Sequence, residues 1–73
     1  MPLCLAPLGM AVEVKKLGAE EKIARHLHGL GIAVGARLTV ISSEGGNVIV
    51  MVKEGRLCLD RQIAARITVA PAA

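Results

Sequence analysis

Apolar and polar residues alternate near the start of the chain, where Val12 and Val14 are separated by Glu13. A period of two is typical of a strand that buries one face, so we predict a strand over residues 11–15. Gly18 is expected to end this strand, because glycine readily adopts the backbone conformations of turns.

The spacing of apolar residues changes to a helical period after that strand. Ile23, Leu27 and Leu30 recur at i, i+4 and i+7, which places them on one face of a helix. We therefore predict a short helix of about two to three turns over residues 20–30. The glycines near its end supply the stop signal.

From Gly35 onward, short apolar runs separated by turn residues indicate a β region. We predict four further strands, at residues 37–41, 47–52, 56–59 and 67–69. The run at 47–52 is apolar on both faces, as in a strand that is covered on both sides. Glycine-containing turns are expected at 44–47 and 53–55, and Asp60 is placed to cap a single helical turn through Ala64.

The two ends of the chain are predicted to lie outside these elements. Pro2 and Pro7 disfavour helix, so residues 1–8 are expected to form an extended arm and residues 70–73 a tail. Residues 1–73 as a whole then form a single, mainly β domain: a small SH3-like five-stranded barrel with one short helix between the first two strands. Closure is favoured because such short strands cannot bury a face as one flat sheet, and because it removes exposed edges.

Composition limits the kind of core and the kind of partner. The chain has 73 residues, none of them Phe, Trp or Tyr, yet 53% are hydrophobic. The hydrophobic content excludes a disordered chain, and the length fits one domain. The core must be aliphatic, and the aromatic-lined groove with which SH3 domains bind proline-rich peptides cannot be built.

The charge pattern does not favour nucleic acid as a partner. The net charge of +3 is mild, and only Lys15 and Lys16 are adjacent basic residues. Nucleic-acid-binding domains usually gather basic residues into a stripe, and domains that bind single strands stack bases on aromatic rings. An RNA-binding barrel is therefore the least favoured of the function classes.

The cysteines and the N-terminal segment indicate a cytoplasmic protein. Cys4 and Cys58 are too few for the disulfide framework of a small secreted domain, so we expect reduced thiols. The apolar run before Glu13 is shorter than the ~20 residues of a membrane-spanning helix, and it lacks the basic leader of a signal peptide. We predict no direct membrane insertion.

No motif of catalytic chemistry is found in the sequence. Residues 18–22 lack the spacing of a phosphate-binding loop, and Ser42 and Ser43 lack the flanking glycines of a nucleophile elbow. The six acidic residues mostly occupy predicted helix starts or turns. We therefore predict that the protein is not an enzyme, with no catalytic residues and no cofactor.

Two histidines and two cysteines are the candidate metal ligands, because imidazole and thiolate suit zinc or ferrous iron. Their spacing argues against a site. His26 and His28 are two positions apart and point to nearly opposite sides of a helix. Cys58 lies between two leucines, where a small buried thiol is the common case. We predict no metal site.

A binding module remains, and its contact surface is expected to be aliphatic. A barrel this small cannot place every apolar side chain in its core, and large exposed apolar patches usually mark partner sites. Methionine is favoured on adaptable contact surfaces. The candidate partner-binding residues are Met10, Ile23, Leu27, Leu30 and Met51.

Two segments carry a recognisable family pattern: residues 30–35 at the predicted helix end, and the closing stretch from Leu59 to Val69. With them the chain resembles the ferrous iron transport protein A (FeoA) family of small bacterial SH3-like domains. Val34 departs from the pattern, since the family often has proline at that position. The other matching positions are Leu5, Leu8, Gly9, Val12, Val14, Leu27, His28, Gly29, Leu38, Val40 and Gly55.

The resemblance implies an accessory protein of ferrous iron uptake, whose permease is a membrane protein with a cytosolic GTP-binding domain. It supplies no catalytic residues. The leading hypothesis is a non-enzymatic cytoplasmic adaptor that docks on this permease and modulates transport. The alternative is a metal-responsive SH3-like regulatory module related to iron-dependent repressors, and the lack of a helix-turn-helix motif counts against it.

Overall fold

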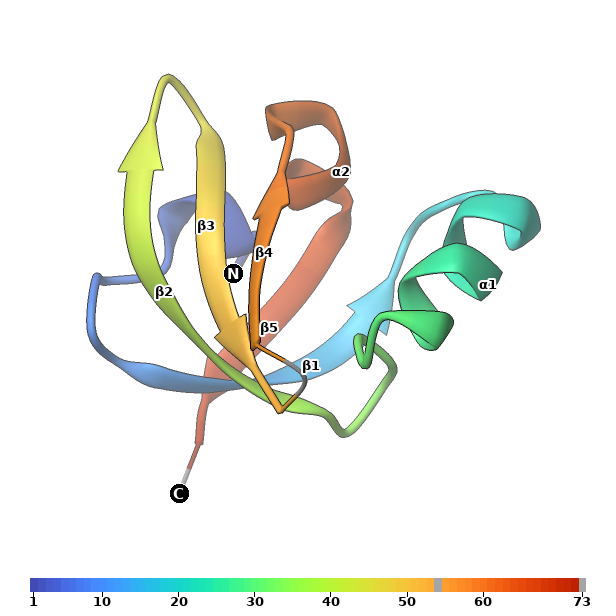
Figure 1. The fold of residues 1–73 in the computed structure, drawn as a ribbon, viewed down its shortest axis with the longest axis horizontal. Helices are drawn as coiled ribbons and strands as arrows, with labels where there is room; N and C mark the ends of the chain where they lie inside the picture. Colours follow the sequence, from blue (N-terminus) through green and yellow to red (C-terminus); the bar gives the residue numbers. More distant parts are fainter. Residues whose placement is uncertain (54, 73) are drawn as a thin grey trace.

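The computed structural model describes residues 1–53 and 55–72, which form a five-stranded antiparallel sheet with short helical segments (Figure 1). The elements in chain order are the 3-10 helix η1 (Leu3–Leu5), β1 (Ala11–Leu17), α1 (Glu21–Gly29), β2 (Arg37–Glu44), β3 (Asn47–Val52), β4 (Gly55–Leu59), α2 (Arg61–Arg66) and β5 (Ile67–Pro71). The predicted mainly β, SH3-like arrangement with a short helix between the first two strands is confirmed.

The sheet curves into the predicted barrel, but the expected closure, which would have removed the exposed edges, is incomplete. Its strand order is β4-β3-β2-β1-β5, so β4 and β5 form the two edges and do not pair with each other among the described residues. Register shifts between Val14 and Lys16 on β1 and between Val40 and Ser42 on β2 interrupt the ladders. Such bulges bend a strand and increase its twist, which allows short strands to wrap around a small core.

The core on the inner side of the sheet is aliphatic, and the described residues bury no polar or charged side chain. Burial of each large apolar side chain contributes roughly 1.5–3 kcal/mol. Every strand supplies core residues, joined by residues of η1, α1 and α2. The buried residues are Leu3, Ala6, Val12, Val14, Leu27, Ile32, Leu38, Val40, Val48, Val50, Val52, Leu59, Ala64, Ile67 and Val69.

The N-terminal residues are not the extended arm that the sequence predicted. Leu3–Leu5 form η1, and Leu3 is fully buried. The Met1 amine donates a hydrogen bond to the Val69 carbonyl oxygen (2.9 Å), and the Val69 N–H donates to the Met1 carbonyl oxygen (2.7 Å). The prediction failed because Pro2 only caps the 3-10 turn, a position where proline is tolerated.

The predicted C-terminal tail is also wrong for residues 70–72. β5 extends to Pro71, and the Ala72 N–H donates to the Ala11 carbonyl oxygen at the start of β1 (3.0 Å). Proline can end an edge strand because it needs no ladder donor there. Ala73 lies outside the described residues.

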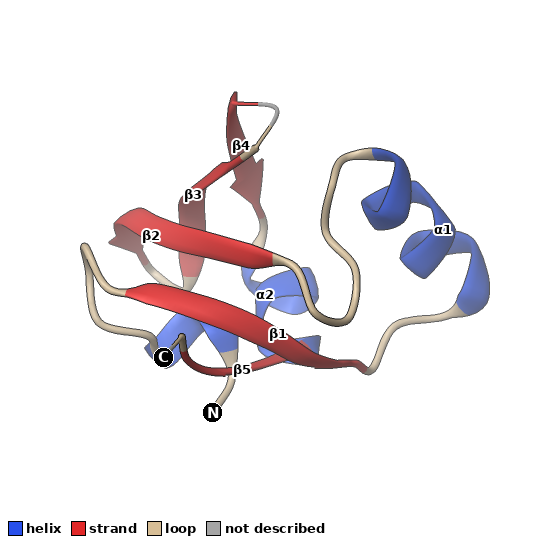
Figure 2. Ribbon diagram, turned by 90° about the horizontal axis from the view of Figure 1, so that it is seen from below, coloured by secondary structure: helices blue, strands red, loops and turns tan. Residues whose placement is uncertain are grey.

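The end of α1 fixes how this helix joins the domain. Gly31 has a φ of +93°, the Ile32 N–H donates to the Leu27 carbonyl oxygen (2.9 Å), and the Gly31 N–H donates to the His28 carbonyl oxygen (3.1 Å). This is the Schellman pattern of helix ends. Leu27 and Ile32 are both buried, so the cap directs the chain back into the core, while α1 stands at one end of the sheet (Figure 2).

The turns between β2, β3 and β4 depend on glycine. Gly45 and Gly46 join β2 to β3 with φ angles of +60° and +89°, which confirms the predicted turn at 44–47. The predicted turn at 53–55 includes Glu54, which lies outside the described residues; Gly55 has a φ of +125°. Asp60 caps α2 as predicted, since its carboxylate accepts a hydrogen bond from the Ile63 N–H (2.9 Å).

Gly46 also lies against α2, which allows a test of the hairpin. A Cβ at Gly46 would lie 2.8 Å from the Arg61 Cβ, whereas a Cβ at Gly45 would meet no atom within 4 Å. Both alanine substitutions carry the cost of positive φ, roughly 1–2 kcal/mol. Gly46→Ala should lower the free energy of unfolding by about 1–3 kcal/mol more than Gly45→Ala, because the new Cβ at position 46 and the Arg61 Cβ must move apart. Urea unfolding followed by circular dichroism measures the free energy of unfolding of both variants. Equal losses of stability would contradict the close contact between position 46 and Arg61.

Candidate docking surface

β3 separates the core from the outer face of the sheet. Val48, Val50 and Val52 point inward and are at most 6% exposed, whereas Ile49 and Met51 are 37% and 40% exposed. The prediction that this strand is covered on both sides is therefore wrong. Side chains alternate strictly along a strand, so the valines that fill the core leave the intervening Ile49 and Met51 on the outer face.

The strand register brings a third apolar side chain to this face. Ile49 lies between Ser42 on β2 and Cys58 on β4. Ile41, which is 37% exposed, occupies the bulge of β2 next to Ser42. Met51 lies two positions along β3 from Ile49. We call Ile41, Ile49 and Met51 the outer apolar patch.

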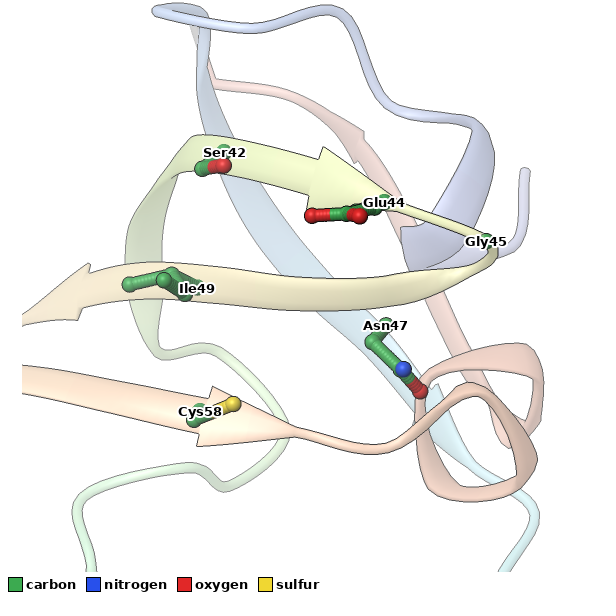
Figure 3. A pocket seen from close by; sticks show the side chains of 6 residues that line it. All are labelled: Ser42, Glu44, Gly45, Asn47, Ile49 and Cys58. Atoms are coloured by element: carbon green, nitrogen blue, oxygen red, sulfur yellow. The ribbon is translucent and has the colours of Figure 1, made fainter.

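A shallow depression of about 560 Å³ adjoins this patch. Figure 3 shows that its lining side chains come from three adjacent strands and the turn between β2 and β3. The Oδ1 atom of Asn47 accepts a hydrogen bond from the Arg61 N–H (2.8 Å), so this wall is held against α2. The depression is open to solvent and suits part of a contact surface. It is lined by Ser42, Glu44, Gly45, Asn47, Ile49 and Cys58.

Charged residues flank the outer face on β1, β2 and β4. Met51 lies next to Arg56 in the register, and Glu13 lies opposite Arg37. The hydrogen bond from Lys15 Nζ to Glu13 Oε2 (2.8 Å) lowers the pKa of Glu13. The positive charge of Lys15 and, to a smaller extent, that of Arg37 lower this pKa further, whereas partial desolvation raises it.

The lowered pKa of Glu13 gives a pH prediction. Since the folded pKa is below the unfolded one, the ion pair contributes above the unfolded pKa and is lost as the pH falls through the folded pKa. Lys15→Met should return the Glu13 pKa toward its ordinary value, whereas Lys16→Met should leave it unchanged. A carboxyl NMR titration measures both, and an unchanged pKa in Lys15→Met would exclude the pair as the cause.

The candidate metal ligands are not brought together. No three His, Cys, Asp or Glu side chains gather within residues 1–53 and 55–72. His26 and His28 are exposed on α1, Cys4 is half-buried, and Cys58 is exposed. The expectation that Cys58 packs as a buried thiol is wrong, because its position opposite Ile49 places it on the outer face of the sheet.

The five predicted partner-binding residues divide between surface and core. Met10 and Met51 are exposed at 38% and 40%, and Ile23 and Leu30 are half-buried on α1 and at its end. Leu27 is only 1% exposed. Its prediction as a contact residue is wrong, because a helix that packs on a domain buries the centre of its apolar face and Leu27 occupies that centre.

The predicted contact residues do not share one depression, and none of them lines the first. Ile23 lines a separate depression of about 190 Å³ between α1 and α2, with Ile63 and Arg66 among its walls, and this depression shares no lining residue with the first. The sequence prediction did not include Ile41 and Ile49. Alternation marks the two faces of a strand, but it does not show which of two apolar faces is inside, and the bulge that exposes Ile41 leaves no sequence signal.

Matched alanine substitutions test the division between core and surface. Leu27→Ala should lower the free energy of unfolding by about 2–5 kcal/mol, since it opens a cavity in the core. Met51→Ala should change it by only about 0.5 kcal/mol, as for other surface positions. Urea titrations of both variants measure the difference. A cost for Met51→Ala equal to that of Leu27→Ala would show that the outer face is part of the core.

Comparison with known proteins identifies the family. A family model described as FeoA domain matches residues 1–71. The chain belongs to the FeoA family. It is 35% identical over 68 residues to a Methanocaldococcus jannaschii protein that bears the name Fe(2+) transport protein A, covering 93% of this chain and 83% of that protein. The resemblance noted in the sequence is confirmed, and the family is involved in Fe(2+) transport.

Solved structures of FeoA proteins show the same fold. The FeoA protein of Chlorobium tepidum, determined by NMR, matches with a TM-score of 0.86 at 30% identity, over 100% of this chain and 71% of that one. A manganese-dependent transcriptional repressor contains the fold as part of a longer chain, with a TM-score of 0.85 at 21% identity, over 99% of this chain and 41% of the repressor.

Within the described residues, no helix has the length and hydrophobicity needed to cross a bilayer.

Proposed function

We propose that this FeoA-family protein is a non-enzymatic, cytoplasmic accessory of ferrous iron uptake. It docks on the cytosolic part of the GTP-binding membrane permease and modulates transport. Family membership supports the role in iron transport. The observation that carries the docking proposal is the outer apolar patch, in which Ile41, Ile49 and Met51 lie on neighbouring strands and keep 37–40% of their surface exposed.

The patch suits a protein partner for physical reasons. Apolar surface held in water is unfavourable, so a partner that covers it gains free energy roughly in proportion to the area removed from solvent. The backbone that carries the patch is held by the paired strands and needs little ordering on binding. Met51 adds a flexible side chain that adapts to the partner's shape. Met10, Ile23 and Leu30 remain proposed contacts on other parts of the surface.

Substitutions in the patch test the docking proposal. Met51→Lys and Ile49→Lys should each weaken binding to the purified cytosolic GTP-binding domain of the permease by about tenfold or more, because each places a charge in an apolar contact. Titration of the labelled chain measures the dissociation constant. The matched control is Val34→Lys, whose parent side chain is 66% exposed and lies outside the patch.

Circular dichroism of each variant shows whether the fold is retained. Binding that is unchanged in Met51→Lys and Ile49→Lys but lost in Val34→Lys would place the contact elsewhere. A wild-type chain that does not bind the permease domain would contradict the proposed function itself.

A further inference from the structure

The two edges of the sheet are protected differently. β5 is covered by the chain's own N-terminus: Met1 and Val69 exchange two backbone hydrogen bonds (2.9 and 2.7 Å), and Pro2 forms a β-bridge with Thr68. This short segment forms an isolated bridge and satisfies the backbone N–H and C=O of Val69, in the middle of β5.

β4 has no comparable cover. Among the residues that the structure describes, its one neighbour in the sheet is β3, and Figures 1 and 2 show it as the last strand at its end of the sheet. Among the described residues, the backbone hydrogen bonds outside the helices and ladders use none of residues 55–59. Alternate residues of an antiparallel strand direct their N–H and C=O groups away from the neighbouring strand, so β4 presents donors and acceptors at an open edge.

β4 has only part of the protection that is usual at an edge: it is short and carries one charge, Arg56, but within the described residues it contains no proline and no bulge. Edge strands are commonly protected by proline, by bulges or by several charges. β4 has the sequence Gly-Arg-Leu-Cys-Leu, with one charged residue, Arg56. Its pairing with β3 runs in continuous register from Val48–Leu59 to Val52–Gly55. An edge of this kind is the template that proteins use when they bind an extended peptide by strand addition.

We propose that β4 is a docking edge, to which an extended segment of the permease's cytosolic part adds as a further strand. This inference rests on the proposed function. Side chains of the added strand on the outer face would lie beside Arg56 and Cys58, which neighbour Met51 and Ile49 in the register. The added strand would therefore extend the surface that contains the outer apolar patch.

The chemistry of β4 indicates what kind of segment fits. An acidic side chain opposite Arg56 forms a favourable cross-strand pair, and an apolar one fits beside Cys58. The net charge of +3 also favours the approach of an acidic segment. A second copy of this chain fits less well, because β4 contains no acidic residue that could pair with Arg56. The occupant is thus an extended segment with apolar residues and an acidic one.

Amide hydrogen exchange tests this docking mode. The full chain, labelled with 15N, is mixed with the purified cytosolic GTP-binding domain of the permease, and exchange is measured for each amide. Strand addition predicts that alternate amides of β4 exchange at least about tenfold more slowly in the complex, because their hydrogen bonds must now open for exchange. The amides of β5 serve as the internal comparison and should change little.

Charge reversal provides a second measurement. Arg56→Glu should weaken binding of the permease domain about tenfold, because an attractive cross-strand pair becomes a repulsive one. Lys22→Glu makes an equal charge change at an exposed position on α1. Its dissociation constant for the permease domain should stay within about twofold of the wild-type value. Equal weakening by both variants would overturn the role of Arg56.

The outcomes separate this inference from the proposed function. Binding without slowed exchange in β4 would overturn strand addition and leave the docking proposal standing. Failure of the wild-type chain to bind would overturn both. Slowed exchange in β4 that grows with the concentration of this chain alone would identify a second copy as the occupant and overturn the choice of partner.

Discussion

The inward-facing row of aliphatic side chains is the constraint on which the rest of the structure depends. Strand side chains alternate with a period of two, and the largest side chains that the described residues place in the core are leucine and isoleucine. The sheet must therefore curve tightly around a small volume, which the bulges in β1 and β2 allow. Once Val48, Val50 and Val52 fill this volume, the intervening side chains of β3 have no place inside.

The outer apolar patch follows from that constraint. Ile49 and Met51 are hydrophobic like the valines they alternate with. They remain on the surface because side chains at their positions in the strand point away from the core. Ile41 joins them through the β2 bulge. The surface that we propose for docking is therefore built by the same alternation that builds the core, and it is held in place by the same ladders.

The chain ends and the open edge show a similar relation between folding and binding. The N-terminal segment returns to β5, where Met1 pairs with Val69, and this covers part of one of the two edges that an incompletely closed barrel leaves. β4 keeps its edge, next to the outer face. Within the described residues, the protein thus presents an open strand edge and exposed apolar side chains together, and these are the two components of recognition by strand addition.

The sequence by itself determined the order of the five strands, of α1 and of the helical turn after Asp60, as well as the aliphatic core and the family resemblance, but it missed η1 and the C-terminal part of β5. Period-two and helical spacing are local properties, and Asp60 as a cap and the glycines after β2 act over a few residues, so one sequence shows them. Only the tertiary structure decided that Leu3 and Leu27 enter the core, that Ile49 and Cys58 lie on the outer face, and that the N-terminus pairs with β5. Each of these depends on which face of an element meets a partner distant in sequence, and local spacing carries no record of that choice.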